Sequence, residues 1–134
     1  MTVVAKVALL YASLNAFVYL GLSWRVVRLR RRYKVGIGYN GKQDLNRAIR
    51  VHANFAEYVP LALVLLFGLE LAGIGSGALH GLGAMLVLGR LLHAYSLSRD
   101  AGQSRGRSLG TGLTWLMIGA SAALGVAAAA GALP

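Results

Sequence analysis

Polar side chains recur at helical spacing between Asn46 and Pro60, in a stretch that is otherwise mostly apolar. Arg50, Asn54 and Glu57 lie at positions i, i+4 and i+7, so a helix would place all three on one face. A guanidinium, a carboxamide and a carboxylate would therefore lie together on one side of this helix. Ionisable side chains inside an apolar helix are costly in a membrane, so these three residues indicate either a site or a buried polar network.

A second polar pair occurs in the segment GRLLHAYSLSR, where Arg90 and His93 are spaced i, i+3. Arg107 opens the next apolar stretch, and helices running back and forth would bring it to the same depth as Arg90 and the Arg50 face. One carboxylate among several guanidiniums leaves surplus positive charge, which favours an anionic ligand. A structural network remains an alternative at this point, with Glu57 paired to Arg90 as a tie between helices.

Four long apolar runs must position these residues. The chain has 134 residues, of which 57% are hydrophobic and 13% charged, whereas soluble domains average about 25% charged residues. Its mean hydropathy is +0.60. Each run has about 20 residues or more, enough to cross a hydrocarbon core of about 30 Å. We therefore predict an all-α integral membrane protein, a bundle of four transmembrane helices in a single domain over residues 1–134, with spans at about 3–27, 48–72, 77–97 and 108–133.

The positive charge is concentrated between these runs. The net charge is +10, from 14 Lys and Arg against 4 Asp and Glu. Twelve of the positive residues lie in or beside the first and third connections, namely Arg25, Arg28, Arg30, Arg31, Arg32, Lys34, Lys42, Arg47, Arg50, Arg99, Arg105 and Arg107. The positive-inside rule predicts that both connections are cytoplasmic and both termini lie outside. Orientation in a lipid bilayer accounts for most of this charge, and we expect no nucleic-acid partner.

The absence of cysteine and the positions of the histidines, Glu70 and Pro60 limit the chemistry that we expect. The chain has no cysteine, so any reactive thiol must arrive with a ligand. No second histidine lies at usable spacing on the polar faces, so we expect no metal site. Glu70 falls near the outer end of the second run and is expected to be solvated. Pro60 removes one helical hydrogen bond and is expected to bend the second helix just beyond the polar patch.

Three stretches of the chain together resemble the MAPEG family, the membrane-associated proteins in eicosanoid and glutathione metabolism. They are RAIRVHANFAEYVPLAL, GRLLHAYSLS and RGRSLG before the last run. The most specific motif is R-x-x-x-N-x-x-E-Y-x-P, matched here by Arg50, Asn54, Glu57, Tyr58 and Pro60. The resemblance covers nearly the whole chain. The chain is similar to the small bacterial members of the family, which implies a bacterial inner-membrane protein.

The resemblance implies a homotrimer that binds glutathione as cosubstrate between neighbouring subunits and acts on hydrophobic electrophiles as a transferase or peroxidase. Glutathione has two carboxylates and one ammonium group, which an Arg-rich site with one Glu complements. A cation near the sulfur favours the thiolate, and this role would fall to Arg107. The residues that would bind the cosubstrate are Arg50, Asn54, Glu57, Tyr58, Arg90, His93 and Ser108.

Two departures from the family pattern bear on activity. Leu97 stands where several of the enzymes have a tyrosine, and Asn46 replaces the acidic residue that often precedes the second-helix motif. More of the family's binding residues than of its catalytic residues are therefore matched in this sequence. One alternative is a non-catalytic membrane protein that binds an anionic lipid or another ligand in the same pocket. A small drug exporter is disfavoured, because such transporters rely on a buried carboxylate in the first helix and residues 3–27 contain none.

Overall fold

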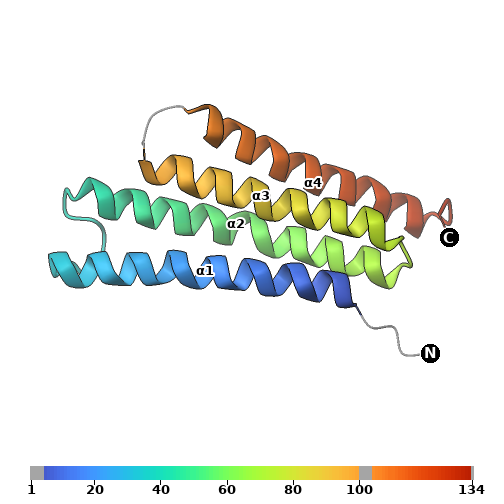
Figure 1. Cartoon of the computed structure of the whole chain (residues 1–134), viewed down its shortest axis with the longest axis horizontal. Helices are drawn as coiled ribbons and strands as arrows, with labels where there is room; N and C mark the ends of the chain where they lie inside the picture. Colours follow the sequence, from blue (N-terminus) through green and yellow to red (C-terminus); the bar gives the residue numbers. More distant parts are fainter. Residues whose placement is uncertain (1–4, 100–103, 134) are drawn as a thin grey trace.

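A computed structural model describes residues 5–99 and 104–133 of the chain. These residues form four α-helices and no strand (Figure 1). The shortest helix has 24 residues, which at 1.5 Å per residue gives a length of about 36 Å. All four are long and apolar enough to cross a membrane, which confirms the predicted four-helix membrane bundle. The helices are α1 (Lys6–Tyr33), α2 (Gln43–Leu71), α3 (Ser76–Arg99) and α4 (Arg105–Ala129).

The helix bounds differ from the predicted spans, mostly at the ends rich in arginine. The predicted first span ends at residue 27 and the second begins at residue 48, whereas α1 continues to Tyr33 and α2 begins at Gln43. Hydropathy marks the part of a helix that faces lipid, but Arg, Leu and Gln extend a helix readily beyond it. The last span was predicted to end at residue 133, and α4 ends at Ala129. Residues 3 and 4 of the first predicted span lie outside the described residues.

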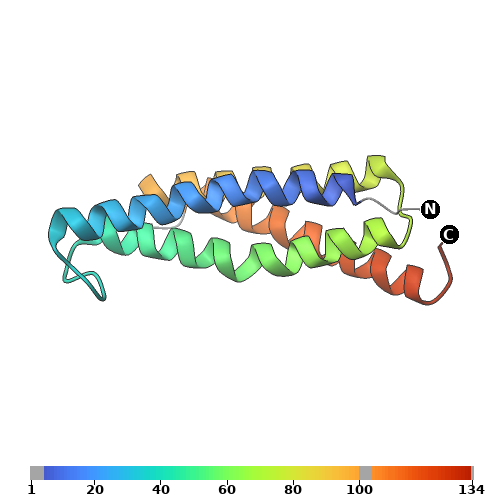
Figure 2. The ribbon, with the colours of Figure 1, turned by 90° about the horizontal axis from the view of Figure 1, so that it is seen from below.

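The two middle helices hold the bundle together. In the described part of the chain, α2 and α3 each contact all the other helices, whereas α1 and α4 do not contact each other. Figure 1 shows α1 and α4 on opposite sides of the α2–α3 pair, and Figure 2 shows the same arrangement from below. The core includes Leu66 of α2, Leu86 of α3 and Met117 of α4, all with no exposed surface. Large apolar faces of α1 and α4 are left open, as expected for lipid contact.

The two ends of the bundle differ in character. At the end that we call the basic end, α1 and α3 finish while α2 and α4 begin (Figure 1). There α1 stops at Lys34, whose φ of 52° is left-handed, and the side chain of Arg30 donates to the carbonyl oxygens of Gly36 and Gly38, both at 3.0 Å. Part of the arginine run therefore shapes the first connection itself.

The opposite end is held by polar contacts from α1 to α2 and α3. The Glu70 carboxylate accepts hydrogen bonds from the backbone N–H groups of Val7 at 2.9 Å and Ala8 at 2.6 Å. It satisfies two of the N–H groups that a helix leaves unpaired in its first turn, so the expectation that Glu70 is solvated is wrong. The Tyr11 hydroxyl donates to the carbonyl oxygen of His80 at 3.1 Å, and its ring packs against Gly83.

Candidate functional site

The buried guanidinium of Arg90 lies where α2, α3 and α4 meet. Arg90 is only 2% exposed. Its Nη1 donates to Asn54 Oδ1 on α2 at 2.8 Å, and its Nε donates to Thr114 Oγ1 on α4 at 3.0 Å. Its Nη2 lies 3.5 Å from the carbonyl oxygen of Gly110. Each guanidinium nitrogen thus has an acceptor, and three helices are joined by one side chain.

The hydrogen-bond and ring partners of Arg90 among the described residues are uncharged. The ring of Tyr58 lies against it, with the ring centroid 5.4 Å from the guanidinium carbon, which is within range of a cation–π contact. Among the described residues no carboxylate forms an ion pair with Arg90, and its partner on α2 is Asn54. The tie between Glu57 and Arg90 that the sequence left open is therefore absent. A buried charge without a counter-ion keeps its electrostatic attraction for an anion nearby.

Close contact between α3 and α4 fixes the depth of Arg90 and His93. A Cβ atom placed on Gly110 would lie 2.6 Å from the carbonyl oxygen of Gly89 and 2.7 Å from the backbone nitrogen of His93. One turn earlier, a Cβ on Gly106 would collide with the side chain of Ser96. Glycine is required where two backbones approach this closely. His93 is buried in this contact, one turn along α3 from Arg90.

The polar face of α2 lies beside this buried cluster, and most of it is exposed. Asn54 and Tyr58 are half-buried against Arg90, whereas Arg50 and Glu57 are exposed. Glu57 is the midpoint of α2, 14 residues after Gln43 and 14 before Leu71. In the described part of the chain, neither Arg50 nor Glu57 has an ion pair or a side-chain hydrogen bond. We call Arg50, Asn54 and Glu57 the polar face of α2.

The first turns of α4 bring two more predicted residues near the basic end. Ser104 caps the helix, accepting a hydrogen bond from the backbone N–H of Arg107 at 3.3 Å. Arg107 is half-buried and Ser108 is exposed. Both line a hollow of about 310 Å³ with Trp115 at its apolar end. Among the described residues no hydrogen bond joins Ser108 to the Arg90 cluster, so the predicted set is divided between a buried cluster, the exposed polar face and the start of α4.

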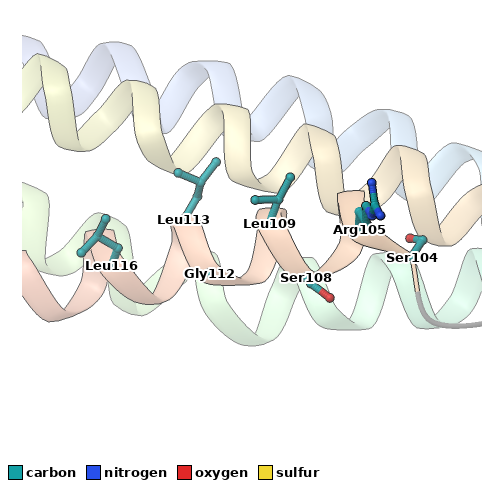
Figure 3. Close-up of a pocket in the computed structure, with 7 residues that line it drawn as sticks. All are labelled: Ser104, Arg105, Ser108, Leu109, Gly112, Leu113 and Leu116. Carbon is teal, nitrogen blue, oxygen red and sulfur yellow. The ribbon is translucent and has the colours of Figure 1, made fainter.

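A larger hollow, of about 720 Å³, runs along α4 on the surface of the subunit. Figure 3 shows Arg105, Leu109 and Leu113 on one side of the helix and Ser108 on the other. The hollow is polar toward the basic end and apolar toward the membrane centre, so it suits an amphipathic or apolar molecule. Its lining is Ser104, Arg105, Ser108, Leu109, Gly112, Leu113 and Leu116.

Two features of the site were not predicted. Thr114 accepts from Arg90 and donates in turn to the carbonyl oxygen of Gly110 at 2.9 Å. A buried threonine in an apolar helix gives no sequence signal that separates it from one that bonds only to its own helix. Arg105 was counted as a loop charge, but it opens α4 and lines the larger hollow.

The sequence of this chain is similar to a known family and to known bacterial proteins. The family model described as the MAPEG family matches residues 8–127. The chain is 39% identical over 109 residues to the inner membrane protein YecN of Escherichia coli K12, which covers 81% of this chain and 82% of that protein. The protein of the same name from Escherichia coli O6:H1 matches with the same identity and coverage.

Proposed function

The chain belongs to the MAPEG family, and on this premise we propose that it binds glutathione, or a similar anionic thiol, on the polar face of α2. The bound thiol would then react with a hydrophobic electrophile that reaches the protein through the bilayer, in a transferase or peroxidase reaction. The four spanning helices and the family place the protein in a membrane. The similarity to an inner membrane protein supports a place in the inner membrane of a bacterium.

The observation that carries this proposal is the exposed Glu57 at the midpoint of a membrane-spanning helix. A carboxylate facing lipid at this depth costs about 2.5–3.5 kcal/mol on insertion scales. Arg50 on the same face is exposed as well, and the described residues provide no partner for either. A charged group at the depth of Glu57 marks a binding site or pathway, and a ligand with both an ammonium group and carboxylates would pair with Glu57 and with Arg50 nearer the basic end.

A second copy of the chain would complete the site. One subunit leaves the polar face of α2 open, and a homotrimer, which the family resemblance implies, would cover it while keeping a polar cleft for the ligand. The open apolar faces of α1 and α4 would then be shared between lipid and neighbouring subunits. The basic end would face the cytoplasm, with both termini on the other side.

Each residue has a role in this proposal. Glu57 would pair with the ammonium group of glutathione and Arg50 with one of its carboxylates, while Arg90 holds Asn54 and Tyr58 in place. His93, buried one turn along α3 from Arg90, would belong to the same binding site. Arg107, beside Ser108 at the start of α4, would stabilise the thiolate. In conjugation the thiolate sulfur forms a bond to the electrophilic carbon, and the leaving group departs with the bonding electron pair. The hollow along α4 would admit the apolar part of the electrophile.

Calorimetric titration of glutathione into the purified protein in lipid nanodiscs tests binding. We expect Arg50→Ala and Glu57→Gln each to weaken binding tenfold or more, because each removes one charged partner. Arg31→Ala is the matched control, since Arg31 is an exposed arginine at the end of α1. Binding that is equal in all four proteins would contradict the proposed site.

Turnover is tested separately with glutathione and 1-chloro-2,4-dinitrobenzene. The wild-type protein should release chloride and form the thioether, and Arg107→Ala should lower kcat more than it weakens glutathione binding. Glutathione binding without turnover in either protein would reduce the proposal to a binding function. Binding of anionic lipid but not of glutathione would favour the non-catalytic alternative.

A further inference from the structure

A buried amide in α1 faces a groove that the proposed glutathione chemistry does not use. Asn15 is 1% exposed. Its Nδ2 donates to the carbonyl oxygen of Tyr11 one turn back at 2.8 Å, whereas its Oδ1 is buried with no hydrogen-bond partner in the described structure. An unpaired acceptor in an apolar environment is costly, and in a membrane no bulk water is present to satisfy it.

Asn15 lines a groove of about 380 Å³ between α1 and α2. On the α2 side the groove is lined by Phe55, Ala56, Val59 and Pro60, and its surface is almost entirely apolar. The volume is within the range of pockets that hold small molecules. Ala56 and Pro60 are exposed on the outside of the subunit, so the groove opens sideways from the bundle.

Pro60 weakens the helical hydrogen bonding of α2 beside the same groove. Proline has no backbone N–H, so the carbonyl oxygen of Ala56, four residues earlier, lacks its usual helical partner. Ala56 and Pro60 both line the groove. The groove therefore combines an apolar wall with the unpaired oxygen of Asn15, and none of the lining side chains donates a hydrogen bond to that oxygen.

We propose that this groove binds an apolar molecule with a single hydroxyl donor, such as a long-chain phenol, whose O–H donates to Asn15 Oδ1. Tyr19 lines the groove and is exposed, so its ring offers a face against which a phenol ring can pack. A plain acyl chain would fill the groove but leave the amide oxygen unpaired. This inference does not depend on glutathione binding, because the residues that line the groove include none of the polar face of α2.

Paired ligands test the proposal without any variant. 4-Octylphenol and its methyl ether, 4-octylanisole, share an apolar body, but only the phenol can donate a hydrogen bond. Binding of each radiolabelled compound is measured in nanodiscs by equilibrium dialysis, with subtraction of empty nanodiscs and without glutathione. We expect the phenol to bind about tenfold more tightly than the ether. Equal affinities would overturn the proposal, and they are expected if a water molecule already satisfies the amide.

Variants then locate the binding. In Asn15→Leu the preference for the phenol should disappear. The control is Ser13→Ala, which removes a polar side chain on the lipid side of the same helix and should keep the preference. Ala16→Phe fills the groove and should abolish binding of both compounds. A preference that persists in Asn15→Leu, or binding that persists in Ala16→Phe, would show that the compounds bind elsewhere and overturn the proposal.

Discussion

Arg90 of α3 donates a hydrogen bond of 2.8 Å to the Oδ1 atom of Asn54 on α2, and it forms no ion pair with the neighbouring Glu57. This contact separates two roles within one sequence motif. Asn54 belongs, with Arg90 and Thr114, to a hydrogen-bonded frame that joins α2, α3 and α4. Arg50 and Glu57 remain available on the outside of the subunit. Variants of the frame should therefore change stability, and variants of the exposed pair should change binding.

Thr114→Val tests the frame with little change in shape. It removes the acceptor of the Arg90 Nε–H, which would stay buried and unpaired, so the free energy of unfolding should fall by about 1–3 kcal/mol. Denaturation of the protein in mixed micelles measures this change. Thr111→Val, one turn earlier on the same helix, is the control and should have little effect. Equal stability of the two variants would argue that Thr114 does not hold Arg90.

Gly110→Ala tests the close contact of α3 and α4. The added Cβ would lie 2.6 Å from a backbone oxygen and 2.7 Å from a backbone nitrogen, so the helices must move apart. We expect a loss of stability of about 1–3 kcal/mol. The control is Gly112→Ala, where a Cβ would meet no atom within 4 Å and the higher helix propensity of alanine should stabilise the protein slightly. Opposite signs for the two variants, measured as thermal midpoints, are the predicted result.

Glu70→Ala tests the polar link between α1 and α2. The substitution leaves the N–H groups of Val7 and Ala8 without their carboxylate, so stability should fall by about 0.5–2 kcal/mol. Hydrogen exchange at these two amides should accelerate more than exchange in the middle of α1. Glu70→Gln keeps an acceptor and should lose less. Unchanged exchange at both amides in Glu70→Ala would contradict the assigned role.

Tyr58→Phe separates the ring from the hydroxyl at the proposed glutathione site. The ring contact with Arg90 remains, and the hydroxyl donates to no described residue, so the thermal midpoint should not change. Glutathione binding should weaken about tenfold if the hydroxyl reaches a charged group of the ligand. Tyr58→Leu should lower both stability and binding. A fall in the midpoint of Tyr58→Phe would instead assign the hydroxyl to the fold.

The number of spanning helices followed from hydropathy, because a bilayer of fixed thickness imposes a length on every apolar run. The ends of the helices did not follow, since an arginine-rich segment such as the end of α1 is helical but no longer apolar. Helical spacing placed Arg50, Asn54 and Glu57 on one face, as a fixed turn angle requires. It did not reveal which of them Arg90 contacts, because that depends on the rotation of α2 against α3.

Contacts between distant residues were the least accessible from sequence. Glu70 was expected to be solvated because it lies near the end of an apolar run, and only the packing of α1 beside α2 brings it to the amides of Val7 and Ala8. The unpaired oxygen of Asn15 is likewise a property of the packed helices and not of any motif. Periodicity describes one helix at a time, whereas these residues act between helices.

The link between Glu70 and the start of α1 also has a consequence for synthesis of the chain. Ala8 leaves the ribosome 62 residues before the carboxylate that caps its backbone N–H. During this interval the first turn of α1 has to satisfy its amides with water at the membrane surface. The cap on these amides can form only after α2 has brought Glu70 to the same end of the bundle. The second helix therefore supplies the polar cap of the first.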